Sequence, residues 1–462
     1  MTAETDDALT ILRGRLIPAQ DGEAAEIPEG LVLLQGSAIR WAGPAAEVPA
    51  GLCSPRVLAQ AEEVPLILPG LVDLHCHGGH GHTFGKDPEG ARATAGFWAR
   101  QGTTSVTASL VTAPTEELTR QITALRPLVE SGELAGLHLE GPFLAPKMSG
   151  AQDPHSLIHG SAELLDQWIE AGRPASPHGG GPRPHPKGAA ATPPSVERSI
   201  SRSDSAVRTI TLAPEIPGFG EVLRVCRAHG VVPSIGHTAA TAAQVRAALE
   251  GPEGPGPWTA THLFNRMAPL SHRKPGPVPV LMCRAMEDPR NTTLELIADG
   301  VHLDPEIIRW VFAMVGADSV ALITDSMAAA GMPDGTYALG AMEVEVREGQ
   351  ARLTGQIANP GALAGGTSTS LGNLRRCVAW GIPLPDAVRA ASATPARILG
   401  LTDRGSITAG HRADLLITDE NLTPLRVYWA GQRVQPETAT LDPLNSDSLH
   451  SDSLRLNPGK DL

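Results

Sequence analysis

Short apolar runs recur along most of the chain, and several of them stop at a polar residue that can take part in chemistry. The run from Val64 to Leu74 predicts a buried strand in spite of its prolines, and His75 and His77 follow it. Because side chains alternate faces along a strand, the two imidazoles should point the same way, with Cys76 turned away from them. Imidazole is a preferred ligand of zinc and iron, so this strand end is a candidate metal site.

The same arrangement recurs at further strand ends, each followed by a stretch long enough for a helix. The polar residues are Glu140 after 136–139, His237 after 231–236, His262 after 258–261, Asp299 with His302 after 292–298, and Asp325 after 319–324. Strands that alternate with helices pair in parallel, and parallel strands whose C-terminal ends carry such residues are typical of the (β/α)8 barrel. An open doubly wound sheet would place its site beside a glycine-rich loop, and the sequence contains neither G-x-G-x-x-G nor a P-loop. We therefore predict an α/β fold built on a TIM-like (β/α)8 barrel.

Each of these residues also has an ordinary structural explanation when it is taken alone. A histidine at a strand end is more often a hydrogen-bonded loop residue than a ligand, and an aspartate after a strand commonly caps the next helix. We interpret His80 and His82 as loop residues and His138 as a structural residue. The joint pattern is harder to explain by chance, and it indicates one metal-dependent site formed by His75, His77, Glu140, His237, His262 and Asp325.

Composition narrows the class of protein. The 462 residues carry a net charge of −13 and only 3% aromatic residues, which argues against a nucleic-acid partner, since phosphate backbones attract basic surfaces. The five widely spaced cysteines include no C-x-x-C pair, so they indicate neither a disulfide framework nor a zinc knuckle. The acidic start lacks the basic and apolar segments of a signal peptide, and no apolar stretch approaches the roughly 20 residues that cross a bilayer. We expect a cytoplasmic enzyme without a membrane partner.

The two ends of the chain predict a second, smaller domain. Short strands are expected near both ends, and neither set alone is large enough for a stable sheet. We expect residues 1–63 and 403–435 to pair into one small β-sandwich beside a barrel that spans 64–402. The stretch 172–207 is rich in Pro, Gly, Ser and Arg, and 436–462 repeats Ser, Asp and Leu, so we expect a disordered insert and a disordered tail.

The motifs around these residues resemble those of the amidohydrolase superfamily. The segment 69–79 is similar to the first-strand signature of that superfamily. Five further segments are similar, in order and spacing, to the N-acetylglucosamine-6-phosphate deacetylases: HLEGPF at 138–143, GHT at 236–238, THLFN at 261–265, DGVH at 299–302 and TD at 324–325. The similarity runs from about residue 8 to 434, apart from the insert. It implies metal-dependent hydrolysis of N-acetyl-D-glucosamine 6-phosphate to D-glucosamine 6-phosphate and acetate, in amino-sugar catabolism.

The resemblance also implies a role for individual residues. Glu140, His237 and His262 would hold a divalent ion, Zn²⁺ or Fe²⁺, and His75 and His77 would hold a second ion with Glu140 bridging, although some members work with one. Asp325 would be the general acid and base, and His302 would be a second catalytic residue near the acetyl carbonyl or the phosphate. Arg273 would act across the interface of a homodimer. The full set implied for the phosphorylated amino sugar is Ala151, Gln152, Asn265, Arg266, Arg273, Asp299, His302, Leu363, Ala364 and Gly365.

Two positions depart from the family pattern, and both bear on how the substrate is held. Gln152 stands where many members carry His, and Arg266 stands where a small residue is usual. A separate check concerns the relatives that hydrolyse cyclic amides, which bridge two metals with a carbamylated lysine at a strand end. No lysine of this chain ends an apolar strand, which disfavours those relatives: Lys86, Lys147, Lys187, Lys274 and Lys460.

These residue types suit amide hydrolysis. A divalent ion makes water more acidic and polarises a carbonyl, and Asp325 can take a proton and pass it to the departing nitrogen. Arginine suits a sugar phosphate because its planar guanidinium pairs with two phosphate oxygens. Two alternatives remain open. One is a related amidohydrolase that acts on another N-acetyl hexosamine phosphate or an N-acyl amino acid, and the other is a non-catalytic barrel that serves as a scaffold.

Overall fold

The computed structural model describes residues 9–20, 25–52, 54–174, 203–354 and 361–436. Most of the insert expected over 172–207 and all but the first residue of the expected tail lie outside these residues. The margins of the insert are packed rather than disordered, because Ser205 Oγ donates to Ile169 O and Ala206 N donates to Gly172 O, each at 2.8 Å. In the described part of the chain, no helix is both long and apolar enough to span a membrane.

Eight parallel strands form the barrel and hydrogen-bond in chain order. They are β5 (Leu71–Cys76), β8 (Thr103–Val111), β9 (Gly136–Glu140), β10 (Val207–Leu212), β11 (Val232–Ile235), β12 (Trp258–Ala260), β13 (Thr292–Ile297) and β14 (Val320–Ile323). The last strand meets the first, since Asp325 N donates to His75 O at 2.9 Å just beyond β14. The strands are buried on both faces, as a parallel sheet covered by helices requires. The predicted (β/α)8 barrel is confirmed.

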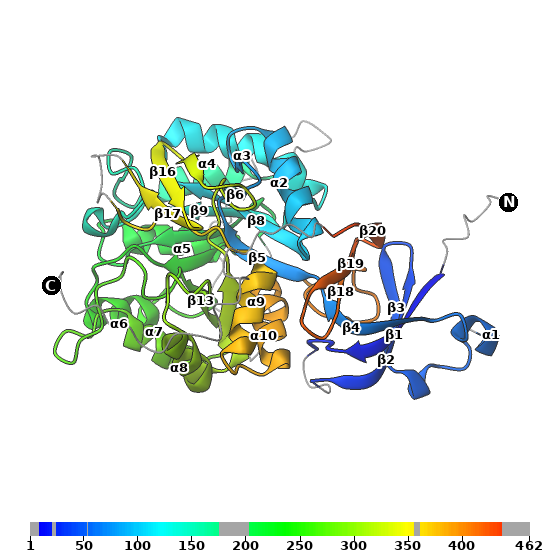
Figure 1. Ribbon diagram of the computed structural model, residues 1–462. Helices are drawn as coiled ribbons and strands as arrows, with labels where there is room; N and C mark the ends of the chain where they lie inside the picture. The colour runs from blue at the N-terminus through cyan, green and yellow to red at the C-terminus, as the bar shows by residue number, and fades with distance from the viewer. Residues whose placement is uncertain (1–8, 21–24, 53, 175–202, 355–360, 437–462) are drawn as a thin grey trace, which may run out of the picture.

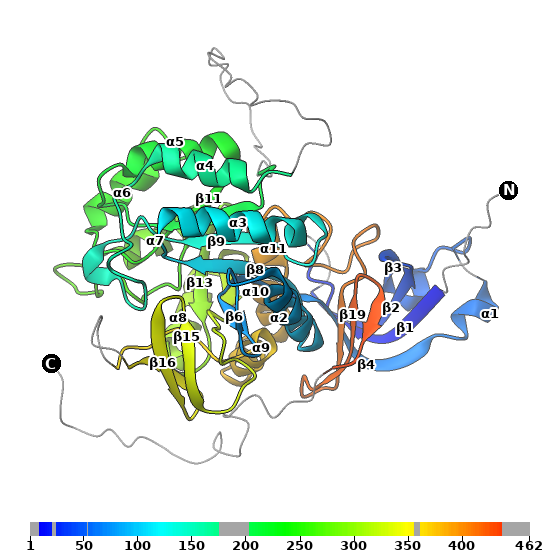
Figure 2. The same ribbon diagram turned by 90° about the horizontal axis from the view of Figure 1, so that it is seen from above.

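Helices cover the outside of the barrel (Figures 1 and 2). In chain order they are α2 (Pro88–Arg100), α3 (Thr115–Glu130), α4 (Ala162–Ala171), α5 (Phe219–His229), α6 (Ala242–Glu250), α7 (Val278–Glu287), α8 (Pro305–Val315), α9 (Ser370–Ala379), α10 (Leu384–Ala391) and α11 (Ala393–Ile398). Several begin at a side-chain cap, such as Asp87 for α2 and the Thr241–Gln244 capping box of α6. Their apolar faces pack on the strands in two large clusters that form the core.

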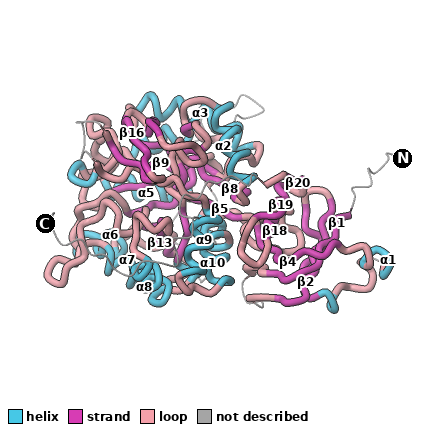
Figure 3. The backbone as a smooth tube through the Cα atoms, in the orientation of Figure 1, coloured by secondary structure: helices cyan, strands magenta, loops and turns pink. Residues whose placement is uncertain are grey.

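The two ends of the chain build one seven-stranded sheet beside the barrel (Figure 3). Its order is β20 (Gln432–Val434), β19 (Pro424–Trp429), β18 (Leu415–Thr418), β4 (Glu62–Pro69), β1 (Leu9–Leu16), β2 (Ile27–Gln35) and β3 (Ala38–Pro44). The sheet curls around one core that includes Leu12, Ile39 and Tyr428, so strands near opposite edges pack together. A segment that carries the short helix α1 (Pro55–Leu58) packs on Ile11 and Leu31 of the other face. The small β-sandwich expected from both ends is confirmed.

The prediction of a single strand over 64–74 is wrong. Strand β4 pairs with β1 and β18 in the small domain, whereas β5 begins the barrel. Gly70 separates them, and a Cβ there would lie 2.1 Å from Thr104 Oγ1, so a side chain would collide. Hydrophobic periodicity does not reveal where a continuous apolar run passes from one sheet to another. We therefore propose Gly70, rather than residue 63 or 64, as the domain boundary.

Residues 335–353 form an element that the apolar pattern did not predict. Strands β15 (Gly335–Leu339), β16 (Met342–Arg347) and β17 (Gln350–Leu353) make an antiparallel sheet between β14 and α9. Its buried side packs against Met327 and Ala364, next to the C-terminal ends of the barrel strands. A second small sheet there consists of β6 (Gly78–Gly79) and β7 (His82–Thr83). Both sheets belong to segments that follow barrel strands at this end of the barrel.

Candidate metal centre

Six side chains, carried by five of the barrel strands, converge at the C-terminal ends of those strands. They form two groups, His75 with His77 and Asp325, and Glu140 with His237 and His262. Within each group the potential ligand atoms all lie within 4.8 Å of one another, and all six residues are buried. The closed barrel thus brings together the six residues that the sequence singled out.

Glu140 links the two groups. Its Oε1 lies 3.1 Å from His237 Nε2 and 3.0 Å from His262 Nε2, and its Oε2 lies 3.1 Å from His77 Nε2. Asp325 Oδ1 completes the cluster, at 3.2 Å from His77 Nε2 and 3.4 Å from His75 Nε2. One carboxylate therefore faces both histidine pairs, which is the position that a bridging ligand needs.

The orientation of the imidazoles fits bound cations. Three of the rings direct Nδ1 at an oxygen that accepts a hydrogen bond: His75 at Glu295 Oε2 (3.0 Å), His77 at Ser109 O (3.1 Å) and His237 at Met148 O (2.7 Å). When neutral, each of these rings therefore carries its hydrogen on Nδ1 and presents the Nε2 lone pair to the cluster. The Nε2 atoms of His75 and His77 are only 3.2 Å apart. Lone pairs that face one another and carboxylate oxygens are stabilised by a divalent cation, so this donor set fits one or two ions.

The charged groups of the cluster shift one another's pKa values. Burial lowers the pKa of His77, but Glu140 and Asp325 outweigh this effect and raise it to about 9. Burial raises the pKa of Asp325, but His75 and His77 hold it at about 2. Asp325 is therefore a carboxylate at neutral pH and can accept a proton.

Three residues of the cluster have a left-handed backbone. The φ angle is 46° at His237, 28° at His262 and 49° at Asp325. Each residue follows the end of its strand by two positions, where the chain turns and aims the side chain at the cluster. Such a conformation costs a non-glycine residue on the order of 1–3 kcal/mol and is concentrated at functional sites.

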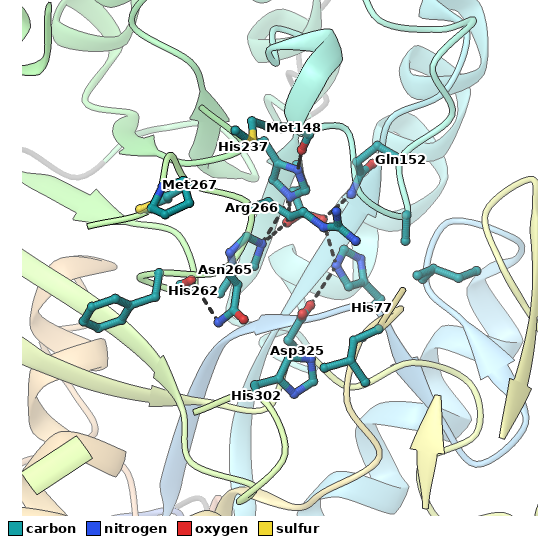
Figure 4. Close-up of a pocket in the computed structure, with 17 residues that line it drawn as sticks. His77, Met148, Gln152, His237, His262, Asn265, Arg266, Met267, His302 and Asp325 are labelled. Atoms are coloured by element: carbon teal, nitrogen blue, oxygen red, sulfur yellow. Dashed lines mark hydrogen bonds and ion pairs between the residues drawn. The ribbon is translucent and has the colours of Figure 1, made fainter. Parts of the chain in front are cut away.

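A cavity of about 430 Å³ opens over the cluster (Figure 4). Twelve residues expected at the site line it: His77, Glu140, Ala151, Gln152, His237, His262, Asn265, Arg266, His302, Asp325, Leu363 and Gly365. The sequence interpretation missed five apolar lining residues, which carry no chemical signal: Met148, Phe264, Met267, Pro269 and Leu339. Leu339 belongs to the unpredicted sheet β15–β17. The cavity has the size and mixed lining of a small-molecule site.

Gln152 supports Glu140 instead of being free for the substrate. Its Nε2 donates to Glu140 Oε2, and its Oε1 accepts a hydrogen bond from Thr112 N at 2.7 Å. The side chain is buried. Both polar atoms of the amide are thus engaged, and the substitution of His by Gln at this position retains a donor to the central carboxylate.

Arg266 is the cation of the cavity. It is half-buried, and burial lowers its pKa. Gly150 leaves room for it, because a Cβ at this glycine would lie 2.8 Å from Arg266 Nε. Within the part of the chain that the structure describes, its guanidinium has no hydrogen-bond or ion-pair partner. A guanidinium that lines this cavity and has no partner among the described residues offers a binding site for an anion.

His302 is held by Asp299. Asp299 Oδ2 accepts a hydrogen bond from His302 Nδ1 at 2.7 Å, and Oδ1 accepts from the backbone N–H groups of Val301 and His302. Burial lowers the pKa of His302, but the hydrogen bond and the charge of Asp299 outweigh it, and the pKa is raised. Asp299 thus contributes through His302 and does not itself line the cavity.

Two other residues predicted to bind the substrate lie away from the cavity. Arg273 is exposed and is not among the lining residues, and Ala364 is buried in the packing beneath β15–β17. In the opposite sense, the interpretation overlooked Glu295, a buried carboxylate 3.0 Å from His75. An acidic residue in the middle of an apolar strand is a signal that could have found it, because such a residue is rarely buried without a partner.

Comparisons with known proteins agree with this geometry. Residues 66–443 match the model of the amidohydrolase family. The N-acetylglucosamine-6-phosphate deacetylase of Lysinibacillus sphaericus is 31% identical over 379 residues, which cover 80% of this chain and 86% of that protein. The N-acetylgalactosamine-6-phosphate deacetylase of Escherichia coli O157:H7 is 30% identical over 81% of this chain and 92% of its own. A mutant N-acetyl-D-glucosamine-6-phosphate deacetylase of Mycobacterium smegmatis, in complex with N-acetyl-D-glucosamine-6-phosphate, aligns with a TM-score of 0.76 at 32% identity, over 92% of this chain and 99% of its own.

Proposed function

The chain belongs to the amidohydrolase family, and on this premise we propose that it hydrolyses the acetamide of N-acetyl-D-glucosamine 6-phosphate. The products are D-glucosamine 6-phosphate and acetate, and the reaction serves amino-sugar catabolism and recycling. The observation that carries the proposal is the meeting of Glu140 with both histidine pairs, next to Asp325, at the base of a cavity whose arginine has no partner among the described residues.

The metal sites of this proposal follow the two groups of ligands. Glu140, His237 and His262 would hold one divalent ion, Zn²⁺ or Fe²⁺, and His75 and His77, together with Glu140, would hold a second. When bound, such ions make water more acidic, polarise the acetyl carbonyl and stabilise the negative charge that develops on its oxygen.

Asp325 moves the proton. As a carboxylate it accepts a proton from the attacking water, whose oxygen bonds to the acetyl carbon. When the bond from this carbon to nitrogen breaks, Asp325 returns the proton to the nitrogen, which leaves as the amine. His302 lies beside Asp325 in the cavity lining (Figure 4), and its second ring nitrogen donates a hydrogen bond to the substrate.

The substrate is held by groups around the rim of the cluster. Arg266 and Asn265 bind the phosphate from the loop after β12, and Ala151, Leu363 and Gly365 lie along the sugar. We further propose that the protein is a cytoplasmic homodimer in which the partner's Arg273 reaches the phosphate. The exposure of Arg273, outside the cavity of its own chain, supports this arrangement, as does the exposed Leu270 three residues before it.

Acetate release from defined substrates tests the proposal. Purified protein loaded with Zn²⁺ or Fe²⁺ is incubated with N-acetyl-D-glucosamine 6-phosphate, with the unphosphorylated sugar and with an N-acetyl amino acid. We expect rapid release only from the phosphorylated sugar. Failure to release acetate from it, by protein whose metal content has been verified, rejects the proposal.

A second candidate substrate is the 4-epimer, N-acetyl-D-galactosamine 6-phosphate. The E. coli O157:H7 relative, which is named for that substrate, is 30% identical to this chain. Comparison of kcat/KM for the two epimers decides between them, because both carry the same acetamide and the same phosphate.

A further inference from the structure

Glu295 is a carboxylate inside the barrel, below the cavity and outside the set of proposed ligands. Strand β13 carries it between Leu294 and Leu296, and its side chain is only 2% exposed. Strands β13 and β5 are not neighbours in the sheet order, so its contact with His75 crosses the interior of the barrel. A buried carboxylate in such a position needs hydrogen-bond donors around it.

Those donors come from both halves of the cluster. Glu295 Oε2 accepts from His75 Nδ1 at 3.0 Å and from His262 N at 3.3 Å, while Oε1 lies 3.5 Å from Ser234 Oγ. The contact with His75 is the only one of these that reaches a side chain of the cluster. Because a carboxylate accepts hydrogen bonds, it holds the hydrogen of His75 on Nδ1 and directs Nε2 at the cluster.

The support of His75 differs from that of the other rings. The Nδ1–H groups of His77 and His237 donate hydrogen bonds to backbone carbonyl oxygens, which are neutral. His75 donates to a charged carboxylate, and such a partner makes an imidazole a stronger ligand by increasing the electron density on the opposite nitrogen.

We propose that Glu295 is a positioning residue for the second metal ion: by holding His75 in one tautomer, it makes the pair His75 and His77 a strong ion site. The inference rests on the metal centre proposed above and goes beyond it, because it assigns a role in ion binding to Glu295, which lies outside the set of proposed ligands.

Ion stoichiometry is the test, so its result is independent of deacetylase activity. Chelator-treated protein is titrated with Zn²⁺ in competition with a chromogenic chelator, and bound zinc is counted by elemental analysis. Wild type should bind two ions per chain. Glu295→Gln has nearly the same shape and removes the charge. It should therefore weaken the binding of the second ion by about 10- to 100-fold and leave the affinity for the first ion unchanged. Two ions of unchanged affinity in this variant, or equal weakening of both, would overturn the inference.

A matched control lies on the same strand. Thr293 is buried two residues before Glu295, and its hydroxyl has no hydrogen-bond partner in the described part of the protein, so Thr293→Val should retain two ions. If Glu295→Gln fails to fold, ¹⁵N NMR of the histidine rings in the wild-type protein shows which nitrogen of His75 carries the hydrogen. The His75→Gln variant identifies the signal of His75. A His75 ring protonated at Nδ1 supports the inference, and one protonated at Nε2 overturns it.

Discussion

Asp299 Oδ2 lies 2.7 Å from His302 Nδ1, and this hydrogen bond joins a residue outside the cavity to one that lines it. The two residues follow strand β13 and are three positions apart, so a single turn places both. Asp299 raises the pKa of His302 and His302 lowers that of Asp299, although burial opposes both shifts. The pair therefore keeps an imidazolium beside Asp325 over a wider pH range than a free histidine would.

This pair predicts a pH effect. A raised pKa means that the charge on His302 is present at low pH and is lost as pH rises through that pKa. Asp299→Asn removes the negative partner, so the pKa of His302 falls and the alkaline limb of kcat/KM should move to lower pH. The measurement is a pH profile of both proteins, and an unchanged alkaline limb would show that His302 does not act as a charged group.

Asp325→Asn should abolish most turnover. Asparagine preserves the shape of the side chain but cannot accept the proton from water, so kcat should fall by about 10²- to 10⁴-fold. Steady-state kinetics check this, together with metal analysis of the variant. Asp304→Asn is a suitable control, because Asp304 caps α8 through Glu306 N and asparagine caps equally well. Retention of more than a tenth of the wild-type kcat in Asp325→Asn would contradict the assigned role.

Arg266→Ala should weaken binding more than catalysis. Loss of a hydrogen bond to a charged group costs about 1.5–3 kcal/mol, which corresponds to a rise in KM of roughly 10- to 100-fold for the phosphorylated sugar. Slow hydrolysis of the unphosphorylated sugar should not change. Arg309→Ala provides the control, since this exposed arginine of α8 pairs only with Glu306 among the contacts that the structure gives it. Equal losses on both substrates would assign Arg266 a structural role instead.

Gly150→Ala should act through Arg266. The φ angle of Gly150 is +63°, and the added Cβ would lie 2.8 Å from Arg266 Nε, so the guanidinium must move. We expect a higher KM for the phosphorylated sugar and little further loss in the double variant with Arg266→Ala, because the two changes remove the same contact. Fully additive effects in this double-mutant cycle would contradict the coupling.

Removal of metal should make stability more sensitive to alkali. Without ions, protons on the histidines balance the carboxylates, and the pKa of His77 is raised to about 9. A raised histidine pKa stabilises the folded state at pH below the unfolded pKa of about 6.5, and this contribution is lost as pH rises towards 9. Chelator-treated protein should therefore lose thermal stability between pH 7 and 9 more steeply than metal-loaded protein. Parallel melting curves over that range would contradict this account.

Much of the site could be recognised along the chain because the ligands stand at or just after the ends of apolar strands. His75 and His77 mark the end of one strand and Glu140 marks the end of another, and parallel strands place such residues at one end of a barrel. The small domain could also be predicted from the sequence, since short strands near both chain ends need one another to form a sheet. The change from one sheet to the other at Gly70 could not be predicted, because a single uninterrupted apolar run contributes to both sheets.

The sequence alone thus determined the barrel, the pairing of the two chain ends and the identity of six residues at the centre. The tertiary structure decided their relations: Glu140 faces both histidine pairs, Gln152 supports Glu140, and Glu295 reaches His75 across the barrel. It also leaves Arg266 without a partner among the residues that the structure describes. The physical reason is the distance along the chain over which each signal acts. Hydrophobic periodicity reports the faces of a single strand, whereas hydrogen bonds between side chains depend on the closure of the whole sheet, which no local pattern records.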